Sequence, residues 1–161
     1  MRASQSPDRA SMAISIRQLL LADRDTLAPL FGAYLDFYRV PRQTAAEEVF
    51  LDERLASSHS TALGAFDGTV LAGFVLCHHT WNSLRLAPAW VLHDLFVQPS
   101  HRRHGIARAL LHAVQEKAAA AGACEVVLST AHDNRSAQAL YENEGYRLDK
   151  EFRVYVRDLR P

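Results

Sequence analysis

Residues 89–108 read AWVLHDLFVQPSHRRHGIAR, and this stretch decides the fold. Its first nine residues are almost continuously apolar, which predicts a central β-strand covered on both faces. Pro99 ends that strand. Residues 105–121 then place apolar side chains at helical spacing, with Gly122 as the C-cap. Residues 125–130 (EVVLST) predict a second buried strand, so the whole segment is a strand-helix-strand crossover with a parallel pair.

The rest of the chain supplies helices and strands around this crossover. For the second helix we expect Thr44 as N-cap and Glu47 as its capping-box partner. Asp67-Gly68 separates two β-rich runs and predicts a tight hairpin. The remaining expected elements are strands at 13–17, 61–66, 69–78, 146–148 and 152–157, and helices at 23–38, 44–56 and 135–144, the last with Asn134 or Asp133 as N-cap.

Length, composition and charge describe one ordinary globular domain. The chain has 161 residues, of which 48% are hydrophobic and 22% are charged. We expect a polar, disordered leader at 1–11 and a single α/β domain at 12–161. Lys and Arg total 18 against 18 Asp and Glu, and zero net charge argues against nucleic acid or a membrane surface as partner.

Other classes are also disfavoured by the sequence. Cys77 and Cys124 each stand alone in an apolar run, which is typical of buried thiols in a reducing compartment. The leader lacks the apolar stretch of a signal peptide, and no apolar run reaches the roughly 18–20 residues that span a bilayer. We therefore expect a cytoplasmic protein. No Cys, His and Asp cluster has the spacing of metal ligands, so no metal is expected.

The loop between the central strand and the long helix has the chemistry of a phosphate site. Backbone N–H groups at a helix N-terminus face outward with partial positive charge and favour an anion. Gly105 lets a ligand approach the backbone, and Ala107 keeps the first turn narrow. Arg102, Arg103 and Arg108 supply full charges. The alternative is an exposed helix start with solvated arginines. Neither a Walker loop nor a dinucleotide fingerprint is present.

Two motifs connect this loop with a known family. The loop reads Arg102-Arg103-His104-Gly105-Ile106-Ala107, which fits the pattern Gln/Arg-x-x-Gly-x-Gly/Ala, and Asn134-x-x-Ala137-x-x-Leu140-Tyr141-x-x-x-Gly145-Tyr146 follows downstream. With these motifs and its element order from Ile14 to Val156, the chain resembles the GCN5-related N-acetyltransferase (GNAT) superfamily. It looks most like the Hpa2-type branch through residues 90–97, residues 137–141 and Phe152-x-Val154-Tyr155.

The resemblance implies a fold and an activity. The fold is α/β, with a mixed, mostly antiparallel sheet of six to seven strands, a parallel pair at the cofactor site and about four flanking helices. The activity is transfer of an acetyl group from acetyl-CoA to a primary amine of a small molecule or protein, by direct attack in a ternary complex. The alternative is a non-catalytic acyl-CoA-binding module that regulates a partner.

The resemblance also implies roles for particular residues. Tyr141 would be the general acid that protonates the departing thiolate, although it could also be a core residue. Spacing puts Asn134 and Tyr141 two helical turns apart on one face, roughly 10 Å from each other. The backbone of Leu95, Phe96 and Val97 would pair with the pantetheine arm, with Asn134 and Ala137 in the second cofactor-binding block. The pyrophosphate would be held by Arg102, Arg103, His104, Gly105, Ile106, Ala107 and Arg108.

The general base is left open by the sequence. An amine with a pKa of about 10.4 must lose a proton before it attacks, and some family members use a Glu on the central strand. Residues 90–92 (WVL) contain no acid, so the nearest candidates are His93 and Asp94. Strand alternation predicts that these two point to opposite faces. We prefer Asp94, with a structural role as the alternative.

The sequence gives two further expectations about partners. The terminal strand with Phe152, Val154 and Val156 could pair or exchange with a second copy, which would make a homodimer. Acidic side chains of the two early helices would give the acceptor pocket a mild negative charge, although solvated helix faces explain them equally well.

Overall fold

The computed structural model describes residues 14–159, which form two compact units divided between Ser129 and Thr130. The expected leader at 1–11 lies outside the described residues. The second unit contains α4 (Arg135–Asn143). The first unit contains β1 (Ile14–Gln18), α1 (Arg24–Phe37), α2 (Thr44–Ala56), β2 (Ser60–Asp67), β3 (Val70–Asn82), β4 (Ala87–Val97), α3 (Ile106–Ala120) and β5 (Val126–Leu128), with short 3₁₀ turns at Leu21–Asp23 and Pro99–His101.

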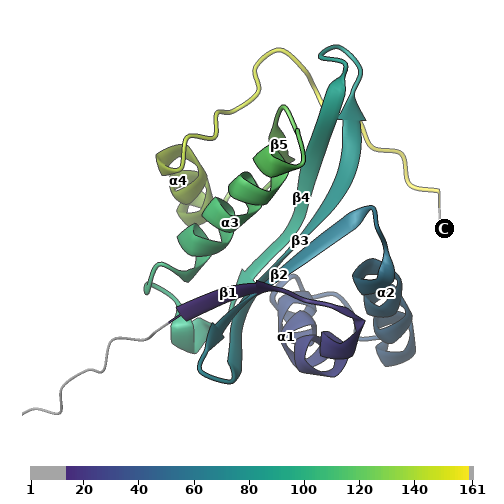
Figure 1. Ribbon diagram of the computed structural model, residues 1–161, viewed down its shortest axis with the longest axis vertical. Helices are drawn as coiled ribbons and strands as arrows, with labels where there is room; N and C mark the ends of the chain where they lie inside the picture. The colour runs from purple at the N-terminus through teal and green to yellow at the C-terminus, as the bar shows by residue number, and fades with distance from the viewer. Residues whose placement is uncertain (1–13, 160–161) are drawn as a thin grey trace, which may run out of the picture. The chain divides into compact units, whose positions relative to one another are not determined.

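The five strands of the first unit form one mixed sheet in the order β1-β2-β3-β4-β5 (Figure 1). The first four strands are antiparallel, and β4 pairs with β5 in parallel. Gly68, with φ +58°, stands in the turn between β2 and β3, a conformation that glycine adopts without steric cost. The predicted hairpin and the predicted parallel crossover are both confirmed.

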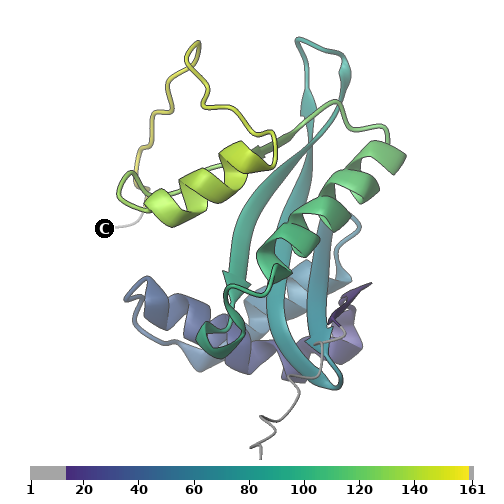
Figure 2. The same ribbon diagram turned by 90° about the vertical axis from the view of Figure 1, so that its left-hand side faces the viewer.

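Helices cover both faces of this sheet (Figure 2). The contacts of β3 show which of its residues face which helix. Phe74 and Leu76 belong to the core cluster with Leu27 and Phe31 of α1. The neighbouring Gly73 faces the other way, because a Cβ there would lie 3.2 Å from Ile106 of α3. Side chains therefore alternate strictly along this part of β3. On the α3 side, Leu110, Leu111 and Val114 are fully buried, each contributing about 1.5–3 kcal/mol by transfer from water.

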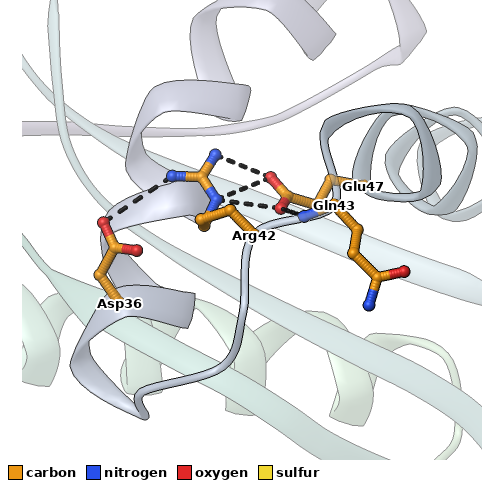
Figure 3. A network of polar contacts seen from close by, with 4 residues as sticks. All are labelled: Asp36, Arg42, Gln43 and Glu47. Carbon is orange, nitrogen blue, oxygen red and sulfur yellow. Dashed lines mark hydrogen bonds and ion pairs between the residues drawn. The ribbon is translucent and has the colours of Figure 1, made fainter.

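The start of α2 differs from the predicted capping box. The N-cap is Gln43, one residue earlier than expected, and Thr44 is already helical. The Glu47 carboxylate accepts the Gln43 N–H at 2.7 Å and also binds the Arg42 guanidinium at 2.7 Å, which in turn lies 3.7 Å from Asp36 (Figure 3). These bonds lower the pKa of Glu47. The Glu47 carboxylate does bond back to the N-cap N–H as predicted, but the Glu47 N–H donates to the Gln43 carbonyl at 2.9 Å instead of to a threonine hydroxyl.

The expected sixth and seventh strands are absent from the described residues. Residues 144–159 contain no strand, so the prediction of six to seven strands is wrong and the sheet has five. Asp149 accepts the backbone N–H groups of Glu151 and Phe152 at 2.8 and 3.1 Å, which forms a turn rather than an extended ladder. Leu148, Phe152, Val154 and Val156 are 67–90% exposed. The segment alternates like a strand but pairs with no strand of the described chain.

Within residues 14–159, no helix has the length and apolar character needed to cross a lipid bilayer.

Candidate active site

The two halves of β4 differ in their neighbours. Along its whole length β4 pairs with β3, but its parallel pairing with β5 is confined to residues 90–92. We call residues 88–92 the paired half and residues 93–97 the open half, because no strand among the described residues borders the second edge of residues 93–97. An unpaired strand edge presents N–H and C=O groups to an extended ligand. Leu95, Phe96 and Val97, the expected pantetheine-binding residues, lie on this open half.

The N-terminus of α3 follows after a short loop and carries no side-chain cap. Gly105 is the N-cap residue with φ +78°, and no capping side chain bonds to this helix end. The first backbone bond of the helix runs from the Ala109 N–H to the Gly105 carbonyl at 2.9 Å. The N–H groups of Ile106 and Ala107 therefore have no helical acceptor. Nothing lies within 4 Å of the place where a Gly105 Cβ would stand, so the backbone here is open to an anion.

The loop before α3 contains one strained residue and is held in place by side-chain contacts. Arg103 has φ +65°, a conformation that costs a non-glycine residue about 1–3 kcal/mol. The Arg102 Nε donates to the Val97 carbonyl at 3.0 Å, and its guanidinium lies 5.7 and 5.5 Å from the ring centres of Phe37 and Phe96. His104 Nδ1 lies 3.2 Å from the His101 carbonyl oxygen. Arg102 thus ties the loop to the end of β4.

The expected cofactor-binding residues of the first unit are therefore brought together on one continuous segment. The open half of β4, the loop with its short 3₁₀ turn and the α3 N-terminus succeed one another along the chain. Arg103 and Arg108 are exposed there and carry full charges. A helix N-terminus with free N–H groups, a glycine and arginines fits a pyrophosphate.

A β-bulge in β4 corrects the prediction that His93 and Asp94 face opposite sides. Leu76 of β3 pairs with Asp94, but the next residue, Cys77, pairs with Leu92, so His93 is an extra residue. Asp94 reaches Tyr34 of α1, and the His93 ring lies 4.7 Å from that of His78. By alternation His78 shares the face of Leu76, which packs against α1. The side chains of His93 and Asp94 therefore both lie on the face covered by α1 and α2.

Asp94 is half-buried and hydrogen-bonded. The Tyr34 hydroxyl donates to its Oδ1 at 2.6 Å. Burial raises the pKa of Asp94, while the Tyr34 hydrogen bond and the His93 charge oppose that rise. A carboxylate with a raised pKa is a stronger base than an ordinary aspartate, which is the property that proton abstraction near neutral pH requires.

His93 is adjacent to Asp94 on β4 and its ring packs against a second histidine, His78. His93 itself is exposed, whereas its neighbour His78 is half-buried and lies 3.3 Å from the Ser60 hydroxyl through Nδ1. Burial is the largest cause that lowers the pKa of His78, followed by the charge of His93. His79 stacks on Trp90 with 4.4 Å between ring centres and contacts Thr61 at 2.9 Å. Its pKa is also lowered, mainly by burial.

Two residues of this site, Tyr34 and His78, were missed by sequence reasoning. Tyr34 falls in the apolar stripe of α1 and so reads as a core residue, and its partner Asp94 is 60 residues away. His78 lies inside an apolar strand run with no motif around it. The bulge that makes both residues neighbours of the site leaves no mark in the sequence. No local signal could have found them.

The second unit contains Asn134, Ala137 and Tyr141, all at the start of α4 or on it. Asn134, one of the two predicted candidates, is the N-cap, and its Oδ1 accepts the Ala137 N–H at 3.2 Å. Tyr141 is half-buried and its ring centre lies 5.9 Å from that of Tyr146. Gly145 has φ +85° and follows the helix end, where left-handed backbone favours glycine.

The acidic side chains of α1 and α2 are mostly engaged by arginines. Asp52 lies 3.4 Å from Arg24, and Glu53 lies 3.5 Å from Arg54. Asp36 and Glu47 share Arg42, as described above. These pairs reduce the negative charge that an acceptor would meet along the two helices. Among residues 14–159, no group of three or more His, Cys, Asp or Glu side chains is placed to hold a metal ion.

Comparison with known proteins agrees with this geometry. A family model described as the acetyltransferase (GNAT) family matches residues 27–146. The uncharacterized N-acetyltransferase YhfO of Bacillus subtilis (strain 168) is 37% identical over 142 residues, which cover 88% of this chain and 95% of YhfO. The crystal structure of a probable acetyltransferase is 33% identical, with a TM-score of 0.86 over 91% of this chain and 99% of that one.

A more distant structure adds the cofactor. The aminoglycoside N-acetyltransferase AAC(6')-Iy was crystallised with CoA; it is 22% identical and has a TM-score of 0.77, over 91% of this chain and 95% of that one, which shows a shared fold. Members of the GNAT family use acetyl-CoA as acetyl donor. The chain belongs to the acetyltransferase (GNAT) family, and it transfers an acetyl group to an amine as an N-acetyltransferase.

Proposed function

We propose that this N-acetyltransferase transfers the acetyl group in one step within a ternary complex, from acetyl-CoA to a primary amine of a small molecule or protein. The amine nitrogen attacks the thioester carbonyl carbon, so that a C–N bond forms and the C–S bond breaks. The nitrogen loses one proton and the departing sulfur gains one. The products are the N-acetylated amine and the thiol of CoA.

One observation carries this proposal: the open half of β4 leads into the uncapped N-terminus of α3. Residues 95–97 have no strand beside their second edge within the described chain, and we propose that the amide groups of a pantetheine arm pair there, next to the Val97 carbonyl that accepts from Arg102. The N–H groups of Ile106 and Ala107 and the left-handed Gly105 offer a site for the pyrophosphate, with Arg103 and Arg108 nearby. Asn134 is proposed to add a hydrogen bond to the pantetheine.

We propose Tyr141 as the general acid and Asp94 as the general base. A thiol with a pKa of about 8.5 leaves more readily when a hydroxyl donates a proton to it. The raised pKa of Asp94 suits it to take a proton from the amine, directly or through water. Residues 90–92 contain no glutamate that could act as the base, which is the feature that would fit a non-catalytic module. The bulge supplies Asp94 and His93 close to that place instead.

The remaining proposals concern the wider context. We propose that residues 12–161 act as one acetyltransferase domain of the Hpa2-type branch. We propose a cytoplasmic location, supported by two free cysteines, Cys77 and Cys124. A homodimer through the C-terminal segment is supported by its exposed Phe152, Val154 and Val156. Light scattering that shows only monomer at micromolar concentration would contradict the dimer.

Calorimetry tests acetyl-CoA binding directly. We expect acetyl-CoA and CoA to bind in the micromolar range. An absence of binding at high micromolar ligand would overturn the proposed cofactor site. Turnover is then measured by thiol release with a panel of polyamines, amino acids, aminoglycosides and peptides with free N-termini.

Tyr141→Phe tests the acid. We expect kcat to fall by about 10²–10⁴-fold, with the Kd for acetyl-CoA unchanged, because only the proton donor is lost. Tyr155→Phe is the matched control, since Tyr155 is 86% exposed in the same unit. An unchanged kcat for Tyr141→Phe would refute the acid role.

A further inference from the structure

We propose that Tyr34 is a positioning residue for the transfer, which orients the Asp94 carboxylate and keeps it ready to accept the proton of the amine. This inference rests on the proposed function, in which Asp94 is the base. It assigns a role to a residue on α1, 60 positions before its partner on β4.

The Tyr34 hydroxyl is fixed in place by the rings around it. Its ring centre lies 5.8 Å from that of Phe31, 5.9 Å from Phe74 and 6.0 Å from Phe96, and the last two meet it edge to face. These contacts come from α1, β3 and β4 respectively. A ring held by three elements leaves its hydroxyl few positions, so the 2.6 Å bond to Asp94 Oδ1 is preorganised.

The bond leaves the carboxylate able to react. Tyr34 occupies Oδ1, so the lone pairs of Oδ2 are available to a proton. Asp94 follows the bulged His93, which gives the strand an irregular path at this point. Without a partner, a half-buried carboxylate could rotate about its side-chain bonds. The hydroxyl therefore selects one orientation of the group that takes the proton.

The charged and titratable groups around Asp94 come from three elements. Tyr34 approaches from α1 and His93 is adjacent on β4, while Cys77 of β3 is close enough to sense its charge. Burial raises the pKa of Cys77 to about 12, so its thiol stays neutral. From α2, Arg54 acts on His78 rather than on Asp94. Tyr34 is thus the neutral donor that stabilises the charged form of Asp94.

Removing the hydroxyl has a directional consequence. The Tyr34 hydrogen bond lowers the pKa of Asp94 against the effect of burial. In Tyr34→Phe the pKa of Asp94 therefore rises further, and the acid limb of the kcat/KM profile moves to higher pH. Below that limb we expect kcat/KM to fall on the order of tenfold. The Kd for acetyl-CoA stays unchanged.

The experiment compares Tyr34→Phe with Tyr38→Phe as matched control. Tyr38 follows one turn later at the end of the same helix, its ring packs 5.1 Å from that of Tyr34, and it is 50% exposed. Both variants keep the ring and remove one hydroxyl. For each protein the pH dependence of kcat/KM is measured, and the Asp94 carboxyl is titrated by ¹³C NMR. Only Tyr34→Phe should shift both quantities.

The outcomes separate this inference from the proposed function. If Tyr34→Phe leaves the Asp94 titration and the acid limb where they are in the wild type, the positioning role is wrong. If both move equally in Tyr38→Phe, the effect is general packing and the role is again wrong. If the titration shifts but the wild type turns over no amine, the proposed function fails and the hydrogen bond has no catalytic meaning. In an Asp94→Asn background, Tyr34→Phe should leave the remaining activity unchanged, and a further tenfold loss there would overturn the inference.

Discussion

The paired and open halves of β4 share one strand but have different surroundings. Residues 90–92 are held by β3 on one side and β5 on the other. Residues 93–97 keep β3 but have no strand on the second side within the described chain. The change occurs at the extra residue His93. The comparison teaches that a single inserted residue, located where the pairing with β5 stops, is enough to turn two titratable side chains toward the same face.

Asp94→Asn is the change with the largest expected effect, and it acts on the open half. We expect kcat/KM to fall by about 10²–10⁴-fold, because the amide cannot accept the proton of the amine. The amide oxygen still accepts the Tyr34 hydroxyl, so the fold is kept. Thiol-release kinetics measure the loss, and circular dichroism checks the fold. Wild-type activity in Asp94→Asn would remove Asp94 from the mechanism.

Leu92→Ala tests the paired half. Leu92 lies where β4 pairs with both β3 and β5, and its side chain is 3% exposed. Its truncation to alanine should lower the free energy of unfolding by about 2–5 kcal/mol. Leu95→Ala in the open half removes the same atoms from a half-buried site and should cost less than half as much. Urea denaturation of both variants measures the difference. Equal losses would contradict the difference in burial between Leu92 and Leu95.

Gly105→Ala and Gly122→Ala compare the two ends of α3. Their φ angles are +78° and +75°, and at neither residue does any atom lie within 4 Å of the place that an added methyl group would take. Both variants should therefore lose about 1–2 kcal/mol of stability. Only Gly105→Ala places its methyl group at the expected pyrophosphate site and should weaken acetyl-CoA binding about tenfold, or about 1.4 kcal/mol. Equal affinity for the two variants in calorimetry would place the phosphate elsewhere.

The smallest expected effect is a pH dependence of stability. Folding raises the pKa of Asp94, so its stabilising contribution is complete below the unfolded pKa of about 4 and is lost as pH rises through the folded pKa. The wild type should therefore have a lower free energy of unfolding than Asp94→Asn at neutral pH. The difference between the two free energies should narrow as the pH is lowered. His78 and His79 have lowered pKa values, so their contribution to stability is lost as pH falls. The wild type and Asp94→Asn share this loss, and it cancels in the comparison. A difference in unfolding free energy that does not change with pH would contradict the burial of Asp94.

Local patterns predicted most of the fold. The apolar run at 89–97, the helical spacing after Gly105 and the Asp67-Gly68 turn are each encoded within a few residues, and the structure confirms the elements they predict. The N-cap of α2 is Gln43, one residue before the predicted Thr44, because the Glu47 N–H bonds to the Gln43 carbonyl and Thr44 already belongs to the helix.

What could not be predicted depends on distant residues. Phe152, Val154 and Val156 alternate like a strand, but a strand also needs a partner edge, and pairing is not a local property. The bulge at His93 left the apolar pattern of β4 intact, so alternation put His93 and Asp94 on opposite faces. The strand end, the loop and the start of α3 were predictable because their signals are local, and phosphate binding by that loop stays a prediction. Tyr34 was not predictable, because its role depends on a contact with another element.

Amide NMR during a titration with CoA tests the central claim most directly. We predict chemical-shift changes concentrated in the open half of β4, at residues 95–97, and at residues 103–107 before and within the first turn of α3. The paired half, residues 88–92, should change little. Changes confined to the paired half or to α2, or no changes at saturating CoA, would contradict the assignment of this segment as the cofactor site.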